Sequence, residues 1–465
     1  MAVRPELRRP NLRAVYRYLA RGDLNLDEEC FFEGIESLPP AHYLVLDRRL
    51  GGRPVRYWSP GAAEVPARRG EAIERFRELL FDSVRIRLRA DVPVGSSLSG
   101  GLDSSSIVST IDALKANADI QQRTFSARFH SRRFDEGRYI REVTAGADAH
   151  ETWVEPEAFA SEFARMQWHQ EEPIASTSPF AQYCVMKLAQ EKGTTVLLDG
   201  QGADEAMAGY DQAHGIVWAH WLTRGRIDRL GREVASYAGR YREEPWRPAL
   251  FATYYLLPQA ARDRIAARYY GSNGVMAEGL RHQFAPAPVA SIEPFEDRLR
   301  NELVRWQLVT QLPEFLRYAD RNSMAFSREV RLPFLDHRLV EYCFGLPADL
   351  LLRGATTKVV LREAMRGIVP DVILERKDKL AYSPPQAKWL RGPLAGWLDG
   401  LLADAAQRRD VFDGDGILAL RRKPPTRRNL AVAWRVASTE AWYQLMIDRP
   451  LPAPNPGGRE PIPAT

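Results

Sequence analysis

The stretch Ser99-Gly100-Gly101-Leu102-Asp103-Ser104 decides the fold class, because it lies between a predicted strand at 91–98 and a predicted helix at 104–114. Free N–H groups and the dipole at a helix N-terminus attract an anion, and glycines let the backbone approach it closely. We therefore expect a phosphate or pyrophosphate on this loop, with the Ser99 and Ser104 hydroxyls as further donors. The alternative is an ordinary glycine-rich turn in which Asp103 and Ser104 only cap the helix.

The residues around this loop alternate between strand and helix patterns. Strands are predicted at 124–129, 151–154 and 195–198, and helices at 71–89, 136–147, 157–169 and 179–190. Such alternation predicts an α/β fold in which helices wrap a parallel twisted sheet. No GxxxxGK[ST] occurs and the GQG around Gln201 does not extend to GxGxxG, which argues against P-loop NTPases and Rossmann dehydrogenases.

A second loop, Leu198-Asp199-Gly200-Gln201-Gly202-Ala203-Asp204-Glu205, also follows an apolar strand. In an open parallel sheet both loops would lie at the carboxyl ends of strands, which is the edge where ligands bind. Asp103 and Asp204 would then provide two hard oxygen ligands for Mg²⁺ shared with phosphate oxygens. The alternative is that Asp204 and Glu205 only complement the dipole at a helix N-terminus.

The composition is that of a globular chain with one large core or two ordinary ones. Of the 465 residues, 45% are hydrophobic and 27% charged, and neither a membrane span nor a signal peptide is found, so we expect a cytoplasmic protein. Three scattered cysteines suggest neither a disulfide framework nor a zinc site. The net charge of +5 is a weak basic excess without a clustered basic face, so we expect neither nucleic acid nor a membrane as a partner.

Lysine is scarce, because only eight of the 65 basic residues are lysines. A lysine kept where arginine is the rule indicates a position that needs a compact ammonium group on a flexible stem. Lys358 and Lys377 are the two lysines singled out on this ground.

The sequence divides into three regions. Residues 1–60 hold short apolar pieces broken by prolines and glycines, which are too few for an independent core. Residues 70–445 are expected to form the main domain, with a sheet core at about 90–210 and a helical region at about 211–445. The proline-rich tail at 446–465 is expected to be disordered.

Five stretches resemble segments of the asparagine synthetases, glutamine-hydrolysing members of the ATP-pyrophosphatase superfamily. SGGLDS at 99–104 resembles the superfamily's pyrophosphate loop, and GQGADEAMAGY at 200–210 resembles the family's GEGADE segment. DRNSMAFSREVRLPFLDHRLVEY, which begins at Asp320, is similar to the family signature DR.SM..S.E.R.PFLD. LPPAHYL with VRYW resembles the end of the glutaminase domain, and ERKDK at 375–379 resembles the lysine segment before the C-terminal helices. The likeness covers most of residues 31–445 and implies the superfamily's α/β sheet with a large helical C-terminal region.

The resemblance implies that MgATP binds to both loops. ATP phosphates would lie on Ser99, Gly100, Gly101, Asp103 and Ser104. Backbone groups near Leu98, Ala127, Asp199 and Gly200 would contact adenine. Asp103 and Asp204 would hold Mg²⁺. Catalytic roles are implied for Asp103, Gln201 and Lys377, and the last would stabilise charge that develops at the α-phosphate and the acyl-adenylate.

Other matched residues receive a structural interpretation. The alternative for Lys377 is a surface lysine in a charged loop. Lys358 matches the family's Lys-x-x-L-R-E pattern and is interpreted as structural. Arg321 is a candidate partner for a substrate carboxylate. A wall between the helical region and the sheet is expected from Arg331, Pro333, Phe334 and Asp336.

Three departures from the family pattern concern the nitrogen source and the acid. The chain begins Met1-Ala2 and its first cysteine is Cys30, so the glutaminase nucleophile is missing. We therefore expect a trimmed gene start, a separate glutaminase, or an amine delivered with the substrate. Gln201 replaces the family's glutamate, and a carboxamide cannot accept the proton. The segment IASTSP, at 174–179, lacks the arginine that helps family members hold aspartate.

The expected function is that of an ATP-dependent amide-forming ligase. It would adenylate a side-chain carboxylate, aspartate by default, release AMP and pyrophosphate, and transfer nitrogen from ammonia or an amine to give asparagine. One alternative is a related amidotransferase or cyclase of secondary metabolism or polysaccharide assembly that acts on a bulkier acid. The other is a non-catalytic subunit or gene fragment, against which the intact Asp103, Asp204 and Lys377 argue. A homodimer is a candidate assembly.

Overall fold

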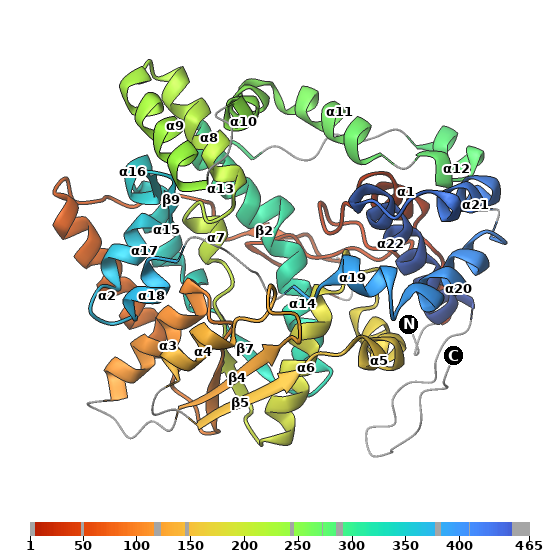
Figure 1. The fold of residues 1–465 in the computed structure, drawn as a ribbon, viewed down its shortest axis with the longest axis horizontal. Coiled ribbons are helices and arrows are strands. Elements are labelled where there is room, and N and C mark those ends of the chain that lie inside the picture. The colour runs from red at the N-terminus through yellow and green to blue at the C-terminus, as the bar shows by residue number, and fades with distance from the viewer. Residues whose placement is uncertain are drawn as a thin grey trace.

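The computed structural model describes residues 5–47, 51–115, 122–144, 148–241, 246–271, 273–284, 292–376, 383–408 and 410–448. A five-stranded parallel sheet forms its centre, with the strand order β5–β4–β3–β6–β7, and helices surround it (Figure 1). The strands are β3 (Val94–Ser97), β4 (Arg123–Arg128), β5 (Asp148–Trp153), β6 (Val196–Leu198) and β7 (Glu329–Arg331). The expected α/β fold with a large helical region is therefore confirmed.

The order of the strands places a switch point in the middle of the sheet. The chain starts at β3, moves outward to β4 and β5, and then returns to β6 and β7 on the other side of β3. Every neighbouring pair is parallel, and β3 pairs with both β4 and β6. Ligands of such sheets bind where the direction of winding reverses, just beyond the carboxyl ends of the strands. Here that point lies between β3 and β6.

Helices cover both faces of the sheet because neighbouring strand residues point to opposite sides. Leu197 belongs to one buried apolar cluster and Leu198 to the other. The Leu197 cluster contains residues of α5 (Pro156–Gln170) and α6 (Ser178–Glu191), and the Leu198 cluster contains residues of α2 (Arg69–Arg87), α3 (Leu102–Lys115) and α4 (Gly137–Val143). The β6 strand is buried on both faces, as is usual in parallel sheets.

The region after β6 is mostly helical. Besides β7, its elements up to residue 374 are α7 (Ala203–Ala206), α8 (Gln212–Thr223), α9 (Ile227–Tyr241), α10 (Trp246–Leu256), α11 (Gln259–Tyr270), η2 (Asn273–Val275), α12 (Glu278–Gln283), α13 (Arg298–Arg305), η3 (Trp306–Thr310), α14 (Leu312–Met324), η4 (Pro333–Leu335), α15 (His337–Gly345), α16 (Ala348–Leu351), β8 (Leu352–Arg353), β9 (Thr356–Thr357), α17 (Val359–Ala364) and α18 (Asp371–Leu374). The last elements are α19 (Gln386–Arg391), α20 (Ala395–Ala405), α21 (Gly414–Arg422), α22 (Arg427–Trp442) and η5 (Tyr443–Asp448).

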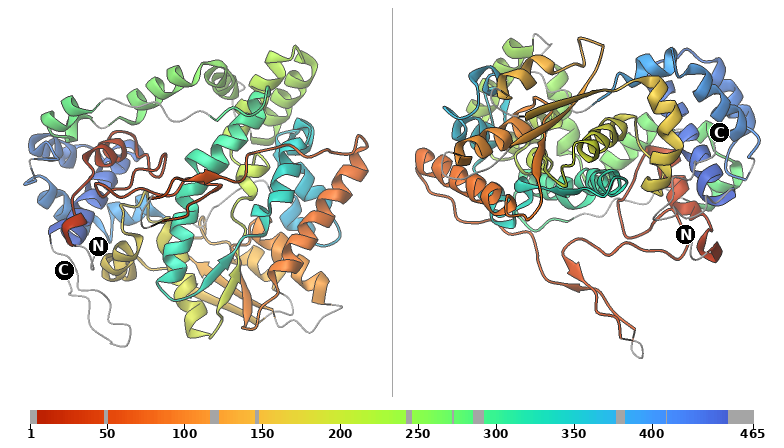
Figure 2. Two further views of the ribbon diagram at one scale, coloured as in Figure 1. Left: turned by 180° about the vertical axis from the view of Figure 1, so that it is seen from behind. Right: turned by 90° about the horizontal axis from the view of Figure 1, so that it is seen from below.

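The first 35 residues pack against the C-terminal helices (Figures 1 and 2). They contain η1 (Pro5–Leu7) and α1 (Leu12–Arg21), and α1 lies on α22. The Tyr18 hydroxyl donates to the carbonyl of Ile174 over 2.7 Å, and the rings of Phe31 and Phe32 lie 5.5 and 5.4 Å from that of Trp442. This segment therefore shares the core of the larger body, although the short hairpin β1 (His42–Tyr43) and β2 (Val55–Arg56) projects away from it (Figure 2, right).

Two sequence expectations differ from the structure. The region at 211–445, expected to be helical, also supplies β7, which completes the sheet beside β6. This strand has three residues, two of them charged, so no apolar run marks it in the sequence. Residues 446–448 of the expected disordered tail belong to η5, and the rest of that tail lies outside the described residues. All three cysteines are free, as expected.

Candidate active site

The two loops predicted to bind a ligand meet at the switch point of the sheet. The loop at 99–104 follows β3, and the loop at 199–205 follows the neighbouring strand β6. A Cβ atom added at Gly200 would lie 3.0 Å from the Asp103 Cβ and 3.0 Å from the Ser104 backbone nitrogen. The loops therefore touch, and their approach requires glycine at position 200.

The first loop holds its shape through its own serine hydroxyls. The Ser99 backbone N–H donates to the Ser104 Oγ over 3.2 Å, and the Gly101 N–H donates to the Ser99 Oγ over 3.2 Å. Gly100 has a φ of 78°, in the left-handed region that favours glycine, and a Cβ there would lie 3.0 Å from the Tyr139 Cβ. The loop opens α3, a 14-residue helix, as the sequence predicts. Its N–H groups and hydroxyls can hold an anion.

The residues expected to contact adenine lie on three neighbouring strands of the sheet. Leu98 follows β3, Ala127 lies near the end of β4, and Asp199 and Gly200 follow β6. Burial raises the pKa of the Asp199 carboxyl, although the backbone N–H groups of Gly200 and Gln201 oppose the shift. The four positions share the carboxyl edge of the sheet, which is consistent with one ligand that contacts all of them.

The two aspartates predicted to bind magnesium converge on one side chain, Lys358. Its Nζ lies 2.6 Å from each carboxylate oxygen of Asp103 and 2.7 Å from the Asp204 Oδ1. Burial lowers the pKa of the Lys358 ammonium, but the two carboxylates raise it by more, so its pKa lies above the ordinary value. Lys358 therefore remains charged at neutral pH and lies within the candidate site, although its motif in the sequence favours a structural role.

The aspartate pair suits magnesium as far as its donors are concerned. Both side chains place carboxylate oxygens around one cationic atom, and Mg²⁺ prefers one or two carboxylates together with phosphate and water oxygens. Within the part of the chain that the structure describes, no group of three His, Cys, Asp or Glu side chains could hold a metal ion. The remaining ligands would thus come from phosphate and water.

Gln201 carries a buried acceptor atom in the second loop. Its Oε1 has almost no contact with solvent and no hydrogen-bond partner among the described residues. A buried acceptor without a donor is costly, and such atoms often mark the place of a ligand. The amide can therefore accept an N–H from a bound molecule, although it cannot accept a proton as the family's glutamate could.

Lys377 lies outside the described residues, but the residue before it contacts the phosphate loop. Arg376 NH1 donates to the Gly100 carbonyl over 2.9 Å, and its NH2 pairs with Glu136. The guanidinium carbon also lies 4.0 Å from the centre of the Tyr139 ring. Arg376 thus brings the start of the lysine segment to the loop at 99–104. The sequence reasoning did not single out Arg376, because arginines are common in this chain.

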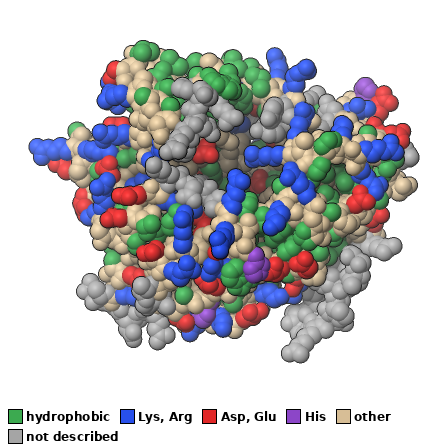
Figure 3. All heavy atoms as spheres, in the orientation of Figure 1, with side chains coloured by type: hydrophobic (Ala, Val, Ile, Leu, Met, Phe, Trp, Pro, Cys, Tyr) green, Lys and Arg blue, Asp and Glu red, His purple; other side chains and the backbone are tan. Residues whose placement is uncertain are grey.

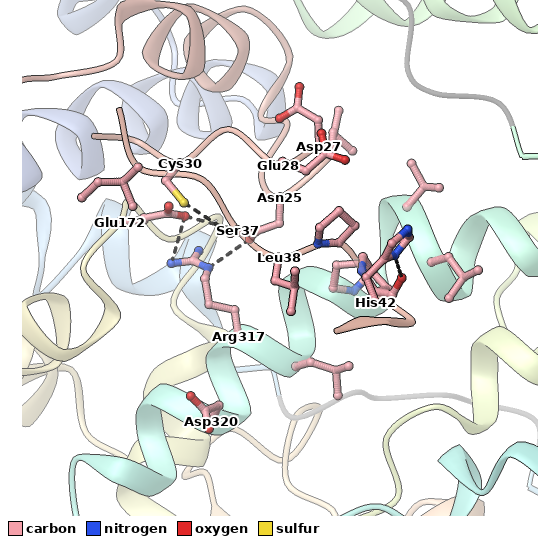
Figure 4. A pocket seen from close by; sticks show the side chains of 18 of the residues that line it. Asn25, Asp27, Glu28, Cys30, Ser37, Leu38, His42, Glu172, Arg317 and Asp320 are labelled. Carbon is pink, nitrogen blue, oxygen red and sulfur yellow. Dashed lines mark hydrogen bonds and ion pairs between the residues drawn. The ribbon is translucent and has the colours of Figure 1, made fainter. Parts of the chain in front are cut away.

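A cavity of about 830 Å³ lies between the N-terminal segment and the ends of α5 and α14 (Figure 4). Arg317 crosses it, donating to Asn25 Oδ1 over 3.0 Å and lying 3.6 Å from Glu172. Arg321 also lines the cavity, where it pairs with Glu171 over 2.8 Å. The guanidinium expected to hold a substrate carboxylate therefore has a protein carboxylate as its partner.

A chain of amide side chains connects this cavity to the second loop. Gln170, which lines the cavity, donates to Asn322 Oδ1 over 2.8 Å. Asn322 donates to Gln182 Oε1 over 3.2 Å, and Gln182 donates to Asp199 Oδ2 over 3.4 Å. The cavity and the carboxyl end of β6 are thus joined by hydrogen bonds through α6 and α14.

The PFLD segment forms part of the wall around the second loop. A Cβ at Gly202 would lie 2.3 Å from the Leu335 Cδ2, so the two segments are in close contact. The Pro333 carbonyl accepts a hydrogen bond from Ser83 on α2, and Asp336 pairs with Arg87 on the same helix. Further members are Arg331, which donates to the carbonyls of Arg87 and Arg89, and Phe334, which is buried.

Positive side chains are gathered around the middle of the face seen in Figure 1, as the space-filling view shows (Figure 3). Among the described residues, every helix is too short or too polar to span a bilayer.

The fold and the two touching loops define a class of doubly wound α/β protein with a ligand edge at its switch point.

Comparisons with known proteins give the family. Residues 75–444 match the family described as Asparagine synthase. The chain is 26% identical over 418 residues to the glutamine-hydrolyzing asparagine synthetase 1 of Bacillus subtilis (strain 168), an alignment that covers 84% of this chain and 62% of that protein. It is 29% identical to Amidase chry2 of Gibberella zeae (82% and 63% covered) and 28% identical to Amidase chyE of Penicillium rubens (79% and 61% covered). The chain therefore belongs to the asparagine synthase family, as its motifs predict, and spans about three fifths of the length of these relatives.

Proposed function

We propose that this chain is an ATP-dependent ligase that forms an amide, with aspartate as the default acid and asparagine as the product. The observation that carries the proposal is the convergence of Asp103 and Asp204 beside the loop at 99–104, at the switch point of the sheet. The family supports ATP-dependent amidation with small-molecule substrates. We infer the acid from the family default and leave the nitrogen donor to the experiment described below.

In the first proposed step an oxygen of the acid bonds to the α-phosphorus of ATP, and pyrophosphate leaves. The N–H groups and hydroxyls of the loop at 99–104 would hold the departing phosphates. Asp103 and Asp204 would hold Mg²⁺, which neutralises phosphate charge when bound. Arg376 contacts this loop, and Lys377, the next residue in the sequence, would stabilise the charge that develops at the α-phosphate.

In the second proposed step a nitrogen atom bonds to the acyl carbon, and AMP leaves. The unpartnered Oε1 of Gln201 would accept a hydrogen bond from an N–H group of the incoming amine. This hydrogen bond would orient the nitrogen lone pair. The proton released from nitrogen must go to another base, because the amide of Gln201 cannot take it. We propose ammonia, a substrate amine or a separate glutaminase as the source of nitrogen. Feeding the purified chain glutamine, ammonium or amines with MgATP separates these sources.

A second candidate function is the amidation of a bulkier acid. The cavity of about 830 Å³ is of the size that holds drug-sized ligands, and aspartate would fill only a small part of it. Two similar proteins are named amidases, and the segment at 174–179 lacks the family's aspartate-binding arginine. The amide chain from Gln170 to Asp199 links the wall of this cavity to the reaction edge through hydrogen bonds. We further propose a cytoplasmic location and a homodimer.

Pyrophosphate exchange tests the first step. Wild-type protein should exchange labelled pyrophosphate into ATP only in the presence of the correct acid, so a panel that starts with aspartate identifies it. Lys377→Ala should lower the exchange rate by about 10² or more with little change in ATP affinity, because it removes charge stabilisation in the transition state. Lys423→Ala, far from both loops in sequence, is the matched control. If the wild-type protein exchanges pyrophosphate in the presence of none of the acids tried, the non-catalytic alternative is favoured.

A further inference from the structure

Lys358 is built into its place between the two aspartates. The residue is 4% exposed, and its backbone has a φ of 53°, in the left-handed region that side chains disfavour. A Cβ at Gly209 would lie 2.2 Å from the Lys358 Cε and 2.0 Å from the Asp204 Oδ1. Glycine at position 209 therefore leaves room for the lysine stem and the carboxylate together. These features describe a fitted side chain and not a surface lysine in chance contact.

The ammonium of Lys358 occupies the position that a divalent cation would need. Its Nζ lies within 2.7 Å of oxygens from both Asp103 and Asp204. Two carboxylates this close repel each other in a buried site unless a cation lies between them. In the structure, the ammonium of Lys358 is that cation.

We propose that Lys358 is the resident counter-ion of the Asp103–Asp204 pair and makes entry of the divalent cation depend on nucleotide. This deepens the function proposed above and rests on its nucleotide site. A divalent ion alone must displace a buried ammonium, which would then have no partner of opposite charge. When ATP binds with the metal, phosphate oxygens give the ammonium a new partner. The ion then takes the carboxylates. Lys358 is thus a positioning residue for the metal ligands.

Manganese provides the probe, because free aqueous Mn²⁺ has a strong electron paramagnetic resonance signal that is lost on binding. We would titrate Mn²⁺ into wild-type protein, Lys358→Met and the matched control Lys187→Met, each with and without ATP. A titration of Mn²⁺ into ATP without protein gives the share of the ion that ATP itself holds. Lys187 pairs with Glu162 over 2.7 Å outside the candidate site. Wild type and Lys187→Met should bind Mn²⁺ only with ATP. Lys358→Met should bind Mn²⁺ without ATP at least about tenfold more tightly than wild type, because the carboxylates lose their counter-ion.

The outcomes separate this proposal from the proposed function. Equal Mn²⁺ affinity of wild type and Lys358→Met without nucleotide would overturn the counter-ion role. So would wild-type protein that binds Mn²⁺ without ATP, and binds it as tightly as with ATP; this measurement needs no variant and stands even where Lys358→Met fails to fold. If wild type binds no Mn²⁺ with or without ATP, while Lys358→Met binds it, the nucleotide site is wrong and the counter-ion role stands.

Discussion

At the scale of single residues, Gly200 sets the distance between the two loops of the candidate site. Its missing side chain lets the second loop lie against Asp103 and Ser104, where a Cβ would be 3.0 Å from both residues. The sequence indicates both loops, but nothing in it says which glycine faces the other loop. That information depends on the pairing of β3 with β6, which joins segments about one hundred residues apart.

We expect Gly200→Ala to weaken ATP binding by about tenfold or more, because the added methyl group forces the loops apart by a few tenths of an ångström. Binding is measured by titration calorimetry with MgATP. Gly231→Ala is the control, since a Cβ there meets no atom within 4 Å and alanine favours the α9 helix. Unchanged affinity in Gly200→Ala would show that nucleotide does not depend on the contact between the loops.

Glu314 is expected to give the stability of the protein an unusual dependence on pH. Burial raises the pKa of its carboxyl from 4.5 to about 7, although the Tyr318 hydroxyl and Arg317 oppose the shift and Asp23 adds to it. Because the folded state binds this proton more tightly than the unfolded state, the free energy of unfolding should fall by about 3 kcal/mol between pH 4.5 and 7.

Glu314→Gln should remove this fall, because glutamine stays neutral and can still accept the Tyr318 hydrogen bond, which spans 2.8 Å. Urea unfolding of both proteins at pH 5 and pH 8 measures the difference. The pH dependence of the free energy of unfolding that the variant also shows is subtracted first. If wild type is then equally stable at the two pH values, the prediction of a raised pKa for Glu314 is wrong.

At the scale of elements, the start of α15 is fastened to α2 by Asp336. This residue caps α15 by accepting from the Arg338 N–H and also pairs with Arg87 of α2 over 3.1 Å. Burial alone would raise its pKa, but hydrogen bonds from Arg338 and Arg87 lower it to about 2. The stability that this carboxylate gives is present above pH 4 and is lost as the pH falls toward 2.

Asp336→Ala should lower the free energy of unfolding at pH 7 by about 2 kcal/mol, because it removes the cap and the carboxylate that Arg87 and Arg338 share. The difference from wild type should shrink as the pH falls from about 4 toward 2, because the carboxyl then takes up a proton more readily in the unfolded chain than in the folded one. Denaturant unfolding at pH 7 and pH 3 measures both effects. Asp228→Ala, which removes a carboxylate from an exposed helix, should leave stability nearly unchanged, and an equal loss there would point to a general charge effect.

The elements of the sheet core follow from the sequence more closely than the rest. The helix expected at 71–89 is α2 (Arg69–Arg87), and the strand expected at 124–129 is β4 (Arg123–Arg128), because apolar spacing marks both. The β7 strand carries no such pattern, since its place is fixed by pairing with β6. The sequence does not predict the contacts of Lys358 for a related reason. These contacts, with Asp103 and Asp204, join positions that only the tertiary fold brings together.

At the scale of the whole molecule, the N-terminal segment and the C-terminal helices form one core. Tyr18, Phe31 and Phe32 are all buried there with Trp442. We expect deletion of residues 1–35 to leave the chain aggregated or unfolded, because α22 would expose its aromatic face. Removal of the hairpin residues 43–56, most of which are exposed, should leave the melting temperature nearly unchanged. Circular dichroism of both deletions tests this, and a folded chain without residues 1–35 would contradict it.

The contact between α1 and α22 also bears on how the protein is made. A ribosome releases α1 long before α22, because more than 400 residues separate them in the chain. During that interval the contacts of Tyr18 and Phe31 with Ile174 and Trp442 are incomplete, so the apolar face of α1 is exposed to solvent and to other molecules. Folding of this half of the molecule is therefore completed only once α22 has been synthesised. Premature termination between α1 and α22 would release a polypeptide in which the apolar face of α1 stays exposed, which makes such products substrates for chaperones.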